Sequence, residues 1–77
     1  MFTYNNKIIR LFNKLTNNGF KVIVNTYYSF EKQATLITDW DIFKVENDSI
    51  IPVLSSRDEA GHKKCKRKDL VEWAKSI

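Results

Sequence analysis

The 77-residue chain has room for one domain, because a chain this short buries only about 60% of the surface that it exposes when unfolded. Hydrophobic residues make up 43%, with two glycines and one proline, which excludes a disordered, collagen-like or low-complexity chain. The single cysteine, Cys65, excludes an internal disulfide. No apolar run is long enough for a signal peptide or a membrane span, so we expect a cytoplasmic protein that does not contact a membrane.

The net charge of +4 is distributed in three blocks along the chain. Residues 1–30 carry four bases and no acid, residues 31–60 carry three bases and seven acids, and residues 61–77 carry six bases and two acids. Basic ends of this kind attract phosphate, which indicates nucleic acid as a partner. A solvated, lysine-rich surface explains the same pattern without a partner.

Apolar residues at helical spacing predict an amphipathic helix from Asn5 to Asn18. Gly19 supplies the left-handed residue that commonly follows the C-terminus of a helix. The helix would hold Lys7, Arg10 and Lys14 within about 60° of one another, since each residue turns the chain by about 100°. This basic stripe is either a solvated face of the helix or a surface that contacts backbone phosphates.

Residues 20–28 are rich in β-branched and aromatic side chains, and they predict a strand that packs on the first helix through Phe20, Val22 and Val24.

Two interpretations of residues 29–49 remain open. Ser29, and Thr38 with Asp41 three residues later, have the pattern of helix N-caps, which predicts helices over 30–37 and 39–47. The other interpretation has a strand over 34–37, followed by a hairpin in which Asn47-Asp48 turns 42–46 back onto 49–54. Because aspartates are favoured in the first turn of a helix and depleted from strands, we favour the helices.

The last third of the chain predicts a strand over 49–54, a polar connection, and a basic return strand over 62–67. Pro52 restricts the first of these strands to an edge of a sheet. From Lys68 onward, apolar residues at helical spacing predict a short helix that buries Leu70 and Trp73.

This order of elements is that of a winged helix-turn-helix domain. Residues 29–77 resemble the small winged-helix domains of phage excisionases and MerR-type regulators in the strand Ile51-Pro52-Val53 and in the basic run that leads into Asp69-Leu70-x-x-Trp73. The short turn between the two central helices and the strand 20–28 depart from that pattern. The resemblance implies one α+β winged-helix domain over 1–77. The alternative fold is a three-stranded antiparallel sheet flanked by N- and C-terminal helices.

The function that this implies is non-enzymatic binding of double-stranded DNA, by a transcriptional or recombination accessory factor of a phage or another mobile element. The acidic second helix is poorly suited to a major groove, because carboxylates repel phosphate. The basic wing, with two residues of that helix, supplies the candidate contacts: Arg57, His62, Lys63, Lys64, Lys66, Arg67, Lys44 and Asn47.

The alternative function is that of a protein-binding effector. It would inhibit a nucleic-acid-handling protein by binding it through the acidic helix 39–48. The candidate interface residues are Asp39, Trp40, Asp41 and Asp48.

The residues favour neither a cofactor nor catalysis. Zinc needs four ligands, whereas His62 and Cys65 are the only histidine and cysteine. No nucleophile has a base and an orienting acid beside it in the sequence, so we expect no enzyme, no metal and no small-molecule substrate. We expect Cys65 to act as a small apolar residue within a strand, although neighbouring cations would lower the pKa of its thiol if it were exposed.

Overall fold

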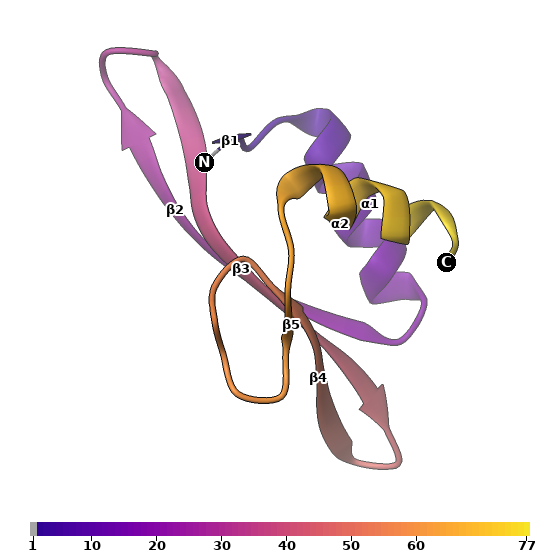
Figure 1. Ribbon diagram of the computed structural model, residues 1–77. Coiled ribbons are helices and arrows are strands. Elements are labelled where there is room, and N and C mark those ends of the chain that lie inside the picture. Colours follow the sequence, from indigo (N-terminus) through magenta and orange to yellow (C-terminus); the bar gives the residue numbers. More distant parts are fainter. Residues whose placement is uncertain (1) are drawn as a thin grey trace.

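The computed structural model describes residues 2–77, in which two helices cover one face of a five-stranded sheet (Figure 1). The elements are β1 (Phe2–Thr3), α1 (Asn6–Asn17), β2 (Phe20–Ser29), β3 (Ala34–Glu46), β4 (Ser49–Ser55), β5 (Lys63–Lys64) and α2 (Arg67–Lys75). The central strand is β3, which pairs antiparallel with β2 along one edge and with β1 and β4 along the other. The short β5 lies parallel to β4. Neither helix within these residues is long and apolar enough to cross a membrane.

The predicted first helix is confirmed, as are the residues that begin and end it. The side chain of Asn5 accepts a hydrogen bond of 3.1 Å from the backbone N–H of Ile8, and Gly19 follows the helix with φ +84°. Ile8 and Leu15 are completely buried against the sheet. The apolar stripe therefore sets which face of α1 packs on the strands.

The predicted helices over 30–37 and 39–47 are wrong, because residues 34–46 form the longest strand of the sheet, β3. Side chains of β3 alternate between the two faces, with Trp40 and Ile42 buried on the helix side and Asp41 on the other. Strands on both sides of β3 bond its backbone, and this pairing outweighs the local capping signals. The winged-helix fold is therefore wrong. The alternative of a sheet with N- and C-terminal helices fits, but the sheet has five strands, one of them parallel, instead of three antiparallel strands.

The turn between β3 and β4 is the hairpin of the other interpretation. Asn47 and Asp48 have φ angles of +45° and +67°, as a two-residue type I′ turn requires. The acidic helix 39–48 does not exist, and its residues form the end of β3 and this turn.

Residues 56–62 do not form a wing, because they lead into a strand parallel to β4 instead of an antiparallel return strand. They cross the sheet face opposite the helices, which we call the open face. There the His62 ring lies 4.8 Å from the Phe43 ring, centroid to centroid. Gly61 has φ +81° and a Cβ at this position would lie 3.3 Å from Pro52, so the loop backbone packs directly on β4.

The hydrophobic core lies between the sheet and the two helices, and it determines the position of α2. Leu70 and Ala74 of α2 are buried against it, and Trp73 packs edge-to-face on Phe20 with ring centroids 5.1 Å apart. The predicted C-terminal helix and its apolar face are confirmed.

Candidate nucleic-acid interface

A pocket of about 380 Å³ opens where the start of α2 meets β1 and β3. The backbone N–H of Cys65 donates to the carbonyl of Ser55 at 2.8 Å, which ties the basic run to the edge of the sheet just before α2 begins. Residues from four separate parts of the chain line the pocket: Phe2, Thr38, Trp40, Ser56, Lys64, Cys65, Lys66 and Arg67. The pocket thus combines cations, hydroxyl groups and aromatic rings.

The cations of this pocket belong to a group that we call the α2 cluster: Lys63, Lys64, Lys66 and Arg67. The guanidinium of Arg67 lies 5.3 Å from the centroid of the Phe2 ring, which holds it at the rim of the pocket. Lys64 approaches Asp58 at 3.9 Å, but both side chains are mostly exposed, so this pair neutralises little charge. The cluster remains strongly positive.

The N-terminus of α2 adds to this positive potential. Aligned peptide dipoles leave partial positive charge at the start of a helix, and Lys66 occupies the N-cap. Asp69 offsets part of it, because its carboxylate accepts a hydrogen bond of 3.4 Å from the Lys66 backbone N–H. Three cations and the helix dipole at the pocket are therefore opposed by two carboxylates, Asp69 and the exposed Asp58.

Trp40 and Cys65 form the buried part of the pocket, with exposed fractions of 4% and 8%. Trp40 Nε1 makes no hydrogen bond of standard geometry with a described residue, but the indole interacts with the Cys65 sulfur, which is a weak acceptor. Burial raises the pKa of the Cys65 thiol above its ordinary value of 9.0, and the Trp40 indole opposes this only in part. The expected lowering by nearby cations does not prevail, because the thiol is buried.

We expect the raised pKa of Cys65 to make the fold less stable in alkali. Below pH 9.0 the thiol is protonated in both states, whereas above it the unfolded chain ionises first and unfolding becomes more favourable. Thermal melts of the wild type and of Cys65→Ala should therefore diverge above this pH, with the wild type losing more stability. Parallel curves through that range would contradict the assignment.

A second group of cations surrounds a groove of about 290 Å³ between α1 and α2. Its floor is apolar, formed by Leu11, Val71 and Ala74. The cations of this helix groove are Lys7, Arg10, Lys14 and Lys75. Lys14 Nζ donates to the carbonyl of Ala74 at 3.0 Å, which places its charge over the C-terminal end of α2. The predicted stripe on α1 is thus extended by a cation of α2.

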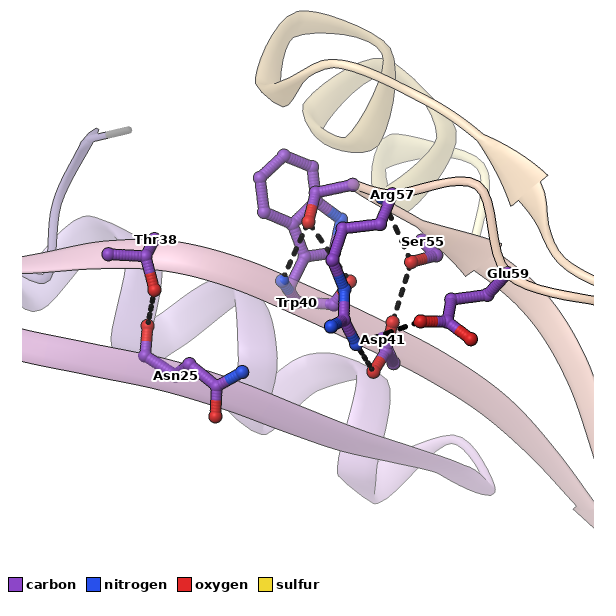
Figure 2. A network of polar contacts seen from close by, with 8 residues as sticks. Asn25, Thr38, Trp40, Asp41, Ser55, Arg57 and Glu59 are labelled. Carbon is purple, nitrogen blue, oxygen red and sulfur yellow. Dashed lines mark hydrogen bonds and ion pairs between the residues drawn. The ribbon is translucent and has the colours of Figure 1, made fainter.

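Two acidic residues of the central block, Asp41 and Glu59, belong to a polar network on the open face (Figure 2). The carboxylate of Asp41 accepts hydrogen bonds from Ser55 Oγ at 2.6 Å and from Arg57 Nη2 at 3.1 Å. Arg57 also pairs with Glu59 at 3.2 Å. These carboxylates therefore lie on the face opposite the helices, where Arg57 neutralises part of their charge.

Replacing Asp41 with asparagine should cost about 1–2 kcal/mol of folding free energy, because it removes charge-assisted hydrogen bonds to Ser55 and to the partly exposed Arg57. Asp39→Asn on the same face is the matched control. Asp39 has no ion pair with a described residue, so its change should stay within about 0.5 kcal/mol. Urea unfolding curves measure both, and equal midpoints for the two variants would contradict a structural role for the network.

The structure brings together only part of the predicted DNA-contacting set. The α2 cluster gathers around the pocket and the start of α2. Arg57 is held by Asp41 and Glu59, and His62 packs on Phe43. Lys44 and Asn47 lie elsewhere on β3 and at the β3–β4 turn. The Nζ of Lys44 sits 4.5 Å from the Phe20 ring centroid.

The four residues predicted as a protein interface do not form one surface. Trp40 is buried in the core on the helix side, so it cannot anchor a partner on the opposite face. Asp39 and Asp41 lie on the open face, and Asp48 is in the β3–β4 turn.

Sequence reasoning missed Phe2, Thr38 and Ser56, which line the pocket, and Lys75, which completes the helix groove. These residues are far from the basic run in the sequence, and only the pairing of β1 with β3 and the packing of α2 on α1 bring them there. The helical spacing of Lys7, Arg10 and Lys14 was the one local signal of the groove.

The chain matches no family model, no curated protein and no solved structure. Within residues 2–77 no group of three or more histidine, cysteine, aspartate or glutamate side chains is arranged to hold a metal ion. The chemistry of the two cation groups therefore carries the functional argument.

Proposed function

We propose that the protein binds double-stranded DNA without catalysing a reaction, and that its helix side contacts the phosphate backbone. The observation that carries this proposal is the clustering of cations on one side of the fold, in the α2 cluster and the helix groove, while Asp39 and Asp41 lie on the other. Lysine and arginine side chains at such sites release the counterions condensed on DNA, which drives association.

The arrangement favours backbone contacts over contacts to bases. Lysine presents a point charge to phosphate, and the N-terminus of a helix is a suitable place for an anion. Binding of unstacked single strands uses exposed aromatic platforms. The most exposed rings, Tyr28 and Phe30, lie at the end of the β2–β3 hairpin, away from α2 (Figure 1). A rigid duplex is therefore the better match.

Such binding suits a small accessory factor of transcription or recombination, which bends or covers DNA for other proteins. The proposal rests on electrostatics and not on a winged-helix fold. Its affinity should depend weakly on DNA sequence and steeply on salt.

Titration of a labelled duplex of about two helical turns, at salt concentrations from 50 to 200 mM, tests the proposal. If about six cations contact phosphates, the logarithm of the affinity should fall with the logarithm of salt with a slope of about −5. A single strand of the same length is the control and should bind more weakly. Absence of salt-dependent duplex binding at 50 mM would refute the proposal.

A second candidate function is capture of a basic protein partner on the open face. Ile23, Val45 and Ile50 are each more than two-fifths exposed there, and Ile23 lies diagonally across from Asp39 in the ladder between β2 and β3. Exposed apolar side chains next to acids suit such an interface. In that case Asp39→Lys should abolish the capture of the partner, whereas alanine substitutions in the α2 cluster should leave it unchanged.

A further inference from the structure

The outer edge of β2 is the longest unpaired strand edge within residues 2–77. Its ten residues pair with β3 alone, and β2 runs along the margin of the sheet (Figure 1). The edge of β4 is partly covered by β5 and interrupted by Pro52, which has no N–H to donate. No strand of residues 2–77 covers the outer edge of β2 in this way.

The register shows which backbone groups point outward. The N–H of Val45 donates to the carbonyl of Gly19 at 2.9 Å, and hydrogen-bonded pairs alternate along an antiparallel ladder. Lys21, Ile23 and Asn25 therefore bond β3. The intervening residues, Val22, Val24 and Thr26, direct their N–H and C=O groups away from the sheet, and no described backbone group bonds them.

This edge also lacks the features that normally prevent pairing. Proteins protect edge strands with lysine, proline, bulges or inward-pointing charges. Within β2 the only charged residue is Lys21, at its beginning, and there is no proline. The register shift between β2 and β3 places the extra residue, Thr38, on β3. Ile23 and Tyr28 leave apolar surface beside the edge, with exposed fractions of 42% and 52%.

We propose that β2 pairs antiparallel with β2 of a second copy of this chain, so that two sheets join into one across a two-fold axis. A second copy fits because an antiparallel edge is self-complementary: each outward donor of one copy meets an acceptor of the same segment in the other. No charge between residues 22 and 30 opposes this approach. Side chains such as Ile23 would lose exposed apolar surface on pairing.

The proposed symmetry places both helix layers on the same side of the joined sheet, because an axis perpendicular to a sheet preserves its faces. The α2 clusters and helix grooves of both copies would then face one direction. The dimer itself does not rest on the DNA-binding proposal, since it concerns a different edge of the molecule.

Sedimentation equilibrium of the wild type, of Thr26→Lys and of Asn13→Lys over a range of concentrations tests the dimer. Thr26 is exposed on the free edge, whereas Asn13 is exposed on α1 and serves as a control for the added charge. The wild type and Asn13→Lys should dimerise equally. Thr26→Lys should raise the dissociation constant by about tenfold or more, which corresponds to about 1.4 kcal/mol.

Amide hydrogen exchange of the wild type provides a readout that needs no variant. Exchange at Val22, Val24 and Thr26 should slow as concentration rises, while exchange at Ile23 and Asn25 should not change, since β3 already bonds their amides. A wild type that stays monomeric at all concentrations would overturn the proposal. So would a Thr26→Lys variant that dimerises as the wild type does.

Discussion

Replacing Trp40 with alanine is expected to destabilise the protein by about 3–5 kcal/mol, the usual cost of removing a large aromatic side chain from a core. Trp40 is 4% exposed and contacts the Phe2 ring edge-to-face, with centroids 5.4 Å apart. Since the total stability of a domain of this size is about 4–12 kcal/mol, the loss is a large part of it, and the melting temperature should fall by about 12 °C or more.

Trp40→Phe is the matched control for this prediction. It retains an aromatic ring against Phe2 and removes only part of the buried area, so its melting temperature should lie between those of the wild type and the alanine variant. Thermal melts followed by circular dichroism measure all three proteins. A Trp40→Ala variant that melts with the wild type would show that β1 and α2 do not pack on β3 at this point.

Replacing Lys64, Lys66 and Arg67 together with alanine should flatten the salt dependence of duplex binding by about 3 units of slope, because each lost phosphate contact removes about 0.9. The loss of affinity between 50 and 200 mM salt should then be about 40-fold smaller than for the wild type. This result is expected because these side chains line one pocket and none of them has a strong ion pair with a described residue.

A second triple variant, with Lys21, Lys32 and Lys44 changed to alanine, separates position from total charge. It loses the same three positive charges, but from β2, the β2–β3 turn and β3. If DNA binds at the pocket, its salt slope should remain close to that of the wild type. Equal flattening in both variants would show that binding follows net charge and that the α2 cluster is not the site.

The elements that the sequence alone determined are those with complete local signals. The helix α1 has a capping side chain at Asn5, an apolar stripe and Gly19 after its end, all within one short segment. The strand β2, the strand β4 and the helix α2 likewise follow from apolar periodicity. For α1, β2 and α2 the face that packs on the core was also predicted correctly, because period 3.6 or period 2 marks that face directly.

Only the tertiary structure decided between the two interpretations of residues 29–49. Thr38 and the aspartates that follow it match a helix cap locally, but β2 and β4 lie on both sides of β3 and bond its backbone. Strand stability depends on such neighbours, which a local pattern does not contain. Local sequence patterns could not predict the candidate site for the same reason. Phe2 and Arg67 are far apart in the sequence, and strand pairing and the packing of α2 bring them together at one pocket.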